Sequence, residues 1–73
     1  MGVLHNTIEY LLNEHDVARI TSLSVATVRR WRLLNRGPKY IKIGAAVRYR
    51  SEDLTAWLQS RPFAGGADQE EAQ

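Results

Sequence analysis

The chemistry open to this sequence is suggested first by a run of basic side chains. Residues 29–50 contain eight arginines and lysines and no acidic residue. These are Arg29, Arg30, Arg32, Arg36, Lys39, Lys42, Arg48 and Arg50. In a compact fold such charges repel one another, and a bound polyanion relieves the repulsion. The run therefore indicates binding to nucleic acid, with a merely solvated basic face as the alternative.

Few residues in the chain are of the types that catalyse reactions or hold metal ions. There is no cysteine, which excludes disulfides and cysteine-based zinc sites. The two histidines, His5 and His15, have no cluster of further ligands beside them, so we expect no metal and no cofactor. We also find no Ser/His/Asp or Cys/His set and no phosphate-binding loop. The sequence therefore favours a binding protein over an enzyme and suggests no small-molecule ligand.

The chain of 73 residues has the size of one small domain, near the lower limit for a core that folds without disulfides or metals. We expect an N-terminal arm over residues 1–12, a folded domain over 13–61 and a disordered acidic tail over 62–73. Without the tail, the chain carries ten basic and five acidic side chains. No apolar run approaches the roughly 20 residues of a membrane span, and the N-terminus lacks a signal-peptide pattern. We therefore expect a cytoplasmic protein without a membrane partner.

A short helix is predicted from Glu14 to about Ile20. Asn13 is a suitable N-cap, and the acidic residues of the first turn interact favourably with the helix dipole. The polar pair Thr21-Ser22 ends this helix.

A second helix is predicted over about residues 25–35, with Ser24 as its N-cap. Val28 and Trp31 share its buried face by their spacing. A glycine and a proline follow the helix, and Gly37 is suited to the left-handed cap.

A β-hairpin is predicted next, because residues 40–43 and 47–50 both alternate between apolar and polar side chains. A three-residue loop over 44–46 would set Lys42 directly opposite Arg48. Like charges in this position destabilise a ladder, so the pair indicates an anion-binding use of the hairpin. The same register gives a core face that consists of Ile41, Ile43, Val47 and Tyr49.

A third helix is predicted from Glu52 to about Ser60, with Ser51 as its N-cap and Pro62 beyond its end. An apolar stripe along this helix should face the core. The stripe consists of Leu54, Trp57 and Leu58, and both tryptophans of the chain are expected to be buried.

The order helix, turn, helix, hairpin, helix is that of a winged helix-turn-helix, a mainly α fold with a small β-hairpin. In this fold the second helix fits the major groove of DNA, where its first turns reach base edges and its basic residues meet phosphates. The hairpin, or wing, lies on the backbone or near the minor groove, whose negative potential attracts arginine.

The stretch from Leu12 to Leu58 resembles the excisionase family of phage and mobile-element DNA-binding proteins. This family shares its helix-turn-helix and wing with the mercury-resistance-regulator (MerR) group. The resemblance covers about two thirds of the chain. The matching pieces are Asp16-Val17-Ala18, residues 23–31, Arg36-Gly37-Pro38, Ile43-Gly44, Val47-Arg48-Tyr49, residues 51–54 and Ala56-Trp57-Leu58.

The resemblance implies which side chains face DNA. The recognition-helix candidates are Ser24, Ala26, Thr27, Arg29 and Arg30. Family members commonly carry glycine where this chain has Ser22, so the turn between the helices is expected to differ in detail. The wing tip, often basic in the family, is Ala45-Ala46 here. The contacts of the wing and backbone are therefore assigned to Arg36, Lys39, Lys42, Arg48 and Arg50, and the hydroxyl of Tyr49 is a further candidate for a phosphate.

An excisionase, or recombination directionality factor, has no catalytic residues of its own. The resemblance implies a protein of a bacterial host cell that binds double-stranded DNA at repeated attachment sites, head to tail and cooperatively. It would bend the DNA and direct a phage-type integrase toward excision. A small transcription regulator of a prophage or mobile element is the alternative, since it would use the same contacts. A module that binds an acidic protein is less favoured, because it gives no reason for a capped, arginine-rich helix.

Overall fold

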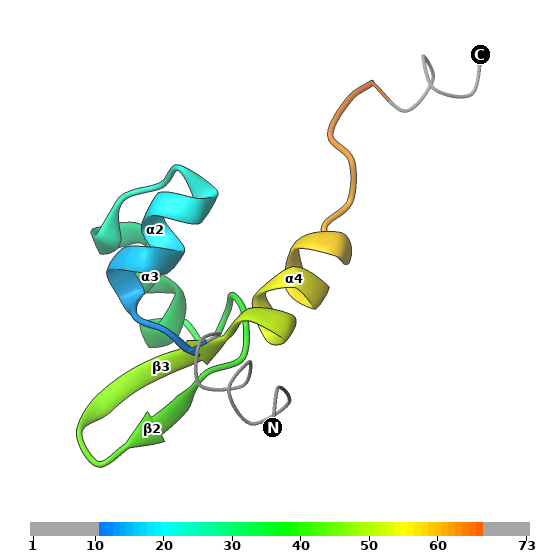
Figure 1. The fold of residues 1–73 in the computed structure, drawn as a ribbon. Helices are drawn as coiled ribbons and strands as arrows, with labels where there is room; N and C mark the ends of the chain where they lie inside the picture. The colour runs from blue at the N-terminus through cyan, green and yellow to red at the C-terminus, as the bar shows by residue number, and fades with distance from the viewer. Residues whose placement is uncertain (1–10, 67–73) are drawn as a thin grey trace, which may run out of the picture.

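The computed structural model describes residues 11–66, which form three helices and a three-stranded antiparallel sheet (Figure 1). Their order confirms the predicted winged helix-turn-helix fold. In chain order the elements are β1 (Leu11–Leu12), α2 (Glu14–Thr21), α3 (Val25–Leu33), β2 (Ile41–Ile43), β3 (Ala46–Arg50) and α4 (Ser51–Gln59). Most of the predicted N-terminal arm, and the acidic residues of the predicted tail, lie outside the described residues. None of the helices within residues 11–66 has the length and apolar character needed to cross a membrane.

Helix α2 begins at the predicted cap and ends in a left-handed residue. The Asn13 side chain accepts a hydrogen bond from the Asp16 backbone N–H at 2.8 Å, and the Asp16 carboxylate accepts from the Asn13 N–H at 2.9 Å. This reciprocal pair satisfies two backbone donors that the first turn leaves free. At the other end Ser22 has φ 60°, and the Leu23 N–H donates to the Ala18 carbonyl at 2.9 Å. Ser22 thus adopts the backbone conformation that glycine usually takes, at a cost of about 1 kcal/mol.

Helix α3 is capped as predicted at its start but ends earlier than predicted. The Ser24 hydroxyl accepts from the Thr27 backbone N–H at 3.1 Å. The left-handed residue that ends the helix is Asn35 (φ 59°), two positions before the predicted Gly37. Its conformation lets the Arg36 N–H donate to the Trp31 carbonyl at 2.7 Å, in a Schellman-type ending.

Gly37 serves a different purpose from the one predicted. It has φ 85°, and a Cβ at this position would stand 2.9 Å from the Cβ of Trp31. The loop after α3 therefore passes against the tryptophan at a distance that only glycine allows.

The sheet has the order β1-β3-β2, so β3 is its central strand. Strand β1 is an addition that the sequence analysis did not predict, because two residues are too few to show a pattern. Leu11 pairs with Arg50, and Leu12 pairs with Tyr49. The chain entering α2 is thereby fixed to the strand that leads into α4.

The predicted register of the hairpin is wrong by one residue. The turn has two residues, Gly44 and Ala45, and the pairs are Ile41 with Arg48, Lys42 with Val47 and Ile43 with Ala46. Gly44 has φ 63° at the first central position, and a turn of this kind matches the right-handed twist of the strands. A shift of one residue moves side chains to the other face.

This shift removes two predictions made for the hairpin. Lys42 does not lie opposite Arg48, so the predicted pair of like charges does not form. Ile43 is 54% exposed and is not in the core. In the observed register Ile41 and Ile43 share a face with Arg48, opposite the face that carries Val47 and Tyr49. Figure 1 shows the hairpin projecting beyond the helices.

The core is small and lies where α2, α3, β3 and α4 meet. Its buried residues are Val17, Ala18, Val28, Tyr49 and Leu54. The two tryptophans are half-buried against it, and the rings of Trp31 and Trp57 join α3 to α4 with centroids 4.9 Å apart.

Two further predictions for α4 are wrong. Leu58 is exposed, because the contact of α4 with the domain is narrow and is filled by Leu54 and Trp57. Ser51 is the first residue of the helix and not its cap, because β3 runs directly into α4 and Arg50 takes the cap position without a side-chain hydrogen bond.

The two glycines of the loops provide a test of this packing. Gly44→Ala places alanine at positive φ in open space and should lower the free energy of unfolding by about 1 kcal/mol. Gly37→Ala adds the overlap with Trp31 and should lower it by about 3 kcal/mol. Urea denaturation followed by tryptophan fluorescence measures both. Equal losses would contradict the close contact between the loop and Trp31.

Candidate nucleic-acid interface

The outer face of α3 carries the predicted recognition residues. Val28 is buried and Trp31 is half-buried on its inner side. The opposite side exposes Ala26, Arg29, Arg30 and Leu33, at the spacing of one helix face. Together with Thr27 they line a shallow hollow of about 480 Å³, and we call these five residues the outer face of α3.

Ser24 and Thr27 stand at the start of this face and are joined to each other. Their hydroxyl oxygens are 3.0 Å apart, in addition to the bond from the Thr27 N–H to Ser24. Both hydroxyls therefore belong to the helix cap, and Ser24 remains exposed. Of the five predicted recognition residues, four line the outer face of α3, and Ser24 lies before it as the N-cap.

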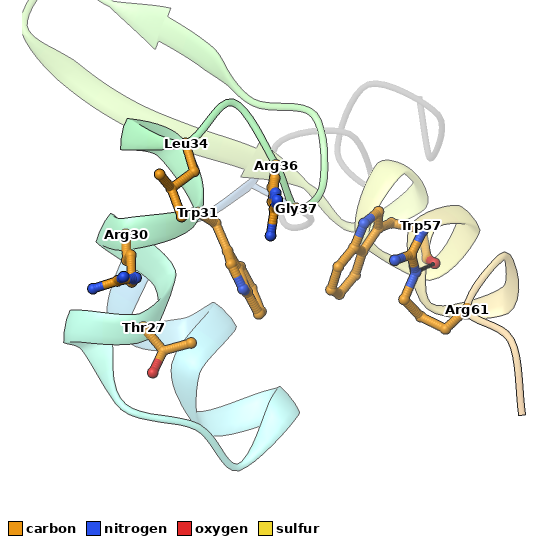
Figure 2. A pocket seen from close by; sticks show the side chains of 8 residues that line it. All are labelled: Thr27, Arg30, Trp31, Leu34, Arg36, Gly37, Trp57 and Arg61. Atoms are coloured by element: carbon orange, nitrogen blue, oxygen red, sulfur yellow. Dashed lines mark hydrogen bonds between the residues drawn. The ribbon is translucent and has the colours of Figure 1, made fainter. Parts of the chain in front are cut away.

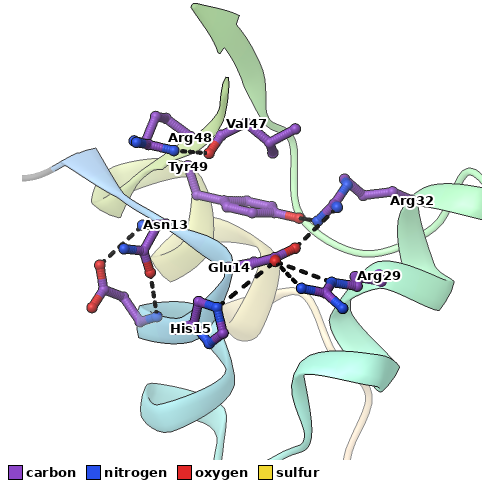
Figure 3. Close-up of polar contacts among 9 residues, drawn as sticks. Asn13, Glu14, His15, Arg29, Arg32, Val47, Arg48 and Tyr49 are labelled. Atoms are coloured by element: carbon purple, nitrogen blue, oxygen red, sulfur yellow. Dashed lines mark hydrogen bonds and ion pairs between the residues drawn. The ribbon is translucent and has the colours of Figure 1, made fainter. Parts of the chain in front are cut away.

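The carboxylate of Glu14 binds two arginines of α3 (Figure 3). Oε2 of Glu14, at the start of α2, accepts from Nε and Nη2 of Arg29 at 3.0 and 2.6 Å. Its Oε1 accepts from Nη2 of Arg32 at 3.1 Å. Arg32 also donates from Nη1 to the hydroxyl of Tyr49 at 3.2 Å. We call these four residues the Glu14 network.

The network shifts the pKa values of its members. Hydrogen bonds from Arg29, followed by those from Arg32, lower the pKa of Glu14 from its ordinary value of 4.5 to about 2. The same contacts raise the pKa of Arg29. Charge-assisted, two-donor contacts of this kind are the stronger class of hydrogen bond, so Glu14 stays ionised through the neutral range.

The network gives different roles to the two adjacent arginines of the outer face. Arg29 uses one edge of its guanidinium on Glu14, which orients the group while other N–H donors stay available. Arg30 is exposed, and no acidic group within residues 11–66 forms an ion pair with it. Arg29 is thus paired within the domain, at 2.6 Å from Glu14, and Arg30 is the adjacent arginine that faces solvent.

The prediction that the hydroxyl of Tyr49 contacts a phosphate is wrong. Tyr49 is buried, and its hydroxyl is the acceptor for Arg32. Tyr49 lies in the core, as its place in the alternating pattern of β3 predicts, and Arg32 covers the hydroxyl from the side of α3. Arg32 lies over the Tyr40 ring, 5.9 Å from its centroid, and is mostly covered.

A groove of about 620 Å³ separates α3 from α4 (Figure 2). Arg30 from α3, Arg36 from the following loop and Arg61 from beyond α4 line it, along with Trp31 and Trp57. We call this the α3–α4 groove, and no acidic side chain within residues 11–66 lines it. Three arginines from three segments of the chain thus converge beside the outer face of α3.

Arg61 is a basic residue to which the sequence analysis assigned no role. Its guanidinium lies over the Trp57 ring, 4.7 Å from the centroid, and Nε donates to the Trp57 carbonyl at 3.3 Å. These contacts orient the side chain into the α3–α4 groove. The spacing of four residues between Trp57 and Arg61, just across the end of the predicted helix, was the signal that would have indicated this contact.

The remaining predicted contacts are spread over the wing and its neighbourhood. Lys42 and Arg50 are exposed. Arg48 is half-buried, and its Nη1 donates to the Val47 carbonyl at 2.7 Å. Lys39 lines a separate hollow beside α4, next to Asp53. Lys39 also lines a hollow with Arg36, on the loop between α3 and β2, whereas Lys42, Arg48 and Arg50 line neither this hollow nor the α3–α4 groove.

One comparison with known proteins identifies the fold at the level of a family. Residues 11–62 match the family described as a helix-turn-helix domain. The matched region begins at β1 and extends past the end of α4, so it includes every helix and strand described above. Among curated proteins, none matches the chain.

The Glu14 network makes the stability of the domain depend on pH. The pKa of Glu14 is lower in the folded state than its ordinary value, so its contribution is complete above about pH 4.5 and is lost as the pH falls toward 2. Glu14→Gln should therefore flatten the fall of melting temperature over this range, leaving the smaller contribution of Asp16, whose pKa is also lowered by its hydrogen bond from the Asn13 backbone.

Circular dichroism melts at a series of pH values measure this effect. The control is Glu52→Gln, which removes an exposed carboxylate from the first turn of α4 and should leave the pH dependence as steep as in the original protein. A Glu14→Gln profile as steep as that control would contradict the assigned role of the network.

Proposed function

The chain belongs to the helix-turn-helix domain family and is a DNA-binding protein, and on this premise we propose that it is an excisionase. The observation that best supports DNA binding is the outer face of α3. Its exposed Arg30 also lines the α3–α4 groove, together with Arg36 and Arg61. The resemblance of residues 12–58 to excisionases supports the finer assignment. Since the family is typically non-enzymatic, its role would be architectural and without catalytic residues.

In the proposed complex α3 enters the major groove with its outer face toward the bases. Arg30 is suited to a guanine, because its guanidinium has no partner within residues 11–66 and can offer two parallel donors. Ser24, Ala26 and Thr27 lie nearest the start of the helix, where side chains approach base edges. Arg29, oriented by Glu14, would use its remaining donors on a phosphate or base nearby.

The phosphate backbone would be held on both sides of α3. We propose that Arg36 and Arg61 bind one strand where it passes along the α3–α4 groove. Lys39, Lys42, Arg48 and Arg50 would bind the backbone next to the wing. Arg61 is added to the predicted set because it lines the same groove as Arg36 and is held there by its contacts with Trp57.

One module of this size covers few base pairs, so useful affinity requires several copies. We propose that copies bind adjacent sites head to tail, bend the attachment-site DNA and favour assembly of the excisive integrase complex. The alternative, a transcription regulator of a prophage or mobile element, would use the same residues at a promoter.

The proposed contacts predict different effects of three arginine variants. Arg36→Ala should weaken binding to all sequences and reduce the slope of log affinity against log salt by about 0.9, because one phosphate contact is lost. Arg30→Ala should also change sequence preference. Arg19→Ala is the control, since Arg19 pairs with Asp16 at 3.1 Å on α2 and lines neither the outer face of α3 nor the α3–α4 groove.

Fluorescence-anisotropy titrations at several salt concentrations, on selected and random duplexes, measure these effects. If Arg30→Ala keeps the original preference among duplexes, α3 does not read bases through Arg30.

The excisionase assignment is tested by gel-shift titration on attachment-site DNA from the source genome, with and without its integrase. We expect stepwise, cooperative bands and increased formation of the integrase complex. Binding at a promoter alone, with no effect on integrase, would replace the proposal by the regulator.

A further inference from the structure

Leu33 is a large apolar side chain that does not pack against the core of the described residues. It is 85% exposed, at the last turn of α3, and it is not among the residues that pack against the core. It lies three residues after Arg30 and seven after Ala26, on the outer face of α3. Leaving a leucine in water is unfavourable, so a bound partner that covers it would gain free energy.

The surroundings of Leu33 restrict what this partner can be. Arg29 and Arg30 stand beside it on the same face, and none of the described acidic residues lines the hollow that they share. A protein that buried Leu33 would also have to neutralise Arg30. The major groove of DNA does both, since it combines phosphates and acceptor atoms with one apolar group, the 5-methyl group of thymine.

The dimensions agree with a position inside the groove. A helix with its side chains is about 10–12 Å across, which fits a groove about 12 Å wide. The rise from Ala26 to Leu33 along the helix axis is about 10.5 Å, which corresponds to about three base-pair steps of roughly 3.4 Å. A helix whose outer face enters the groove therefore brings both apolar side chains to base edges, with Arg30 between them.

We propose that Leu33 contacts the 5-methyl group of a thymine next to the base pair that Arg30 reaches, with Ala26 as a smaller apolar contact on the same face. This inference rests on the proposed entry of α3 into the major groove. It makes Leu33 a specificity-determining residue that selects T·A pairs.

Deoxyuridine provides the test, because it lacks only the methyl group and keeps every hydrogen-bonding atom of thymine. A duplex is first selected from random sequence with the full-length protein. Each thymine is then replaced by deoxyuridine in turn, and affinities are measured for the original protein and for Leu33→Ala. Phe63→Ala is the matched control, since Phe63 is 74% exposed but lies beyond α4.

At one thymine we expect deoxyuridine to weaken binding of the original protein about four-fold. Leu33→Ala should bind the thymine duplex more weakly and lose the difference between thymine and deoxyuridine at that position. Phe63→Ala should keep the difference. Because the side chain of Leu33 is exposed, the melting temperature of Leu33→Ala should equal that of the original protein.

Several outcomes would overturn the inference. In the first, the original protein binds tightly and no deoxyuridine substitution weakens binding. This result would contradict the role of Leu33 but not the DNA-binding function. A second is an effect of deoxyuridine that persists in Leu33→Ala. A third is a loss, in Leu33→Ala, confined to the second and later copies on a multi-site duplex, which would make Leu33 a contact between copies. Failure of the original protein to bind any duplex would instead overturn the proposed function.

Discussion

The carboxylate of Glu14 connects three parts of the domain. Through Arg29 and Arg32 it binds α3 to the first turn of α2, and through Arg32 it reaches the buried hydroxyl of Tyr49 on β3. Five buried side chains alone form a core too small to fix the rotation of a nine-residue helix. Removing Glu14 would leave Arg32 partly covered without its anion, and such unpaired groups are costly.

The same interaction determines which positive charges remain for a partner. Arg32 and Arg29 both bind Glu14, and Arg32 is largely covered, whereas Arg30 is exposed to solvent. The run of basic residues in the sequence therefore divides into charges that stabilise the fold and charges that face solvent. A polyanion would meet the second group, and with it the convergence of Arg36 and Arg61 in the α3–α4 groove.

Aromatic contacts build the other side of this groove. The Trp31–Trp57 contact sets the separation of α3 from α4, and Gly37 lets the intervening loop pass close to Trp31. Arg61 then rests on Trp57. Because the arginine of one segment is oriented by a ring from another, the charge pattern of the groove depends on tertiary packing.

The sequence by itself determined the features that depend on neighbouring residues. The caps at Asn13 and Ser24, and the buried face of α3, follow from local hydrogen bonding and periodicity, and they were enough to predict the winged helix-turn-helix order. The tertiary structure decided the hairpin register, the pairing of Arg29 with Glu14 fifteen residues away, and the direction of Arg61. These features depend on distances between segments. A local pattern fits two registers of a short hairpin equally well, and the two-residue turn, with Gly44 at positive φ, selects one.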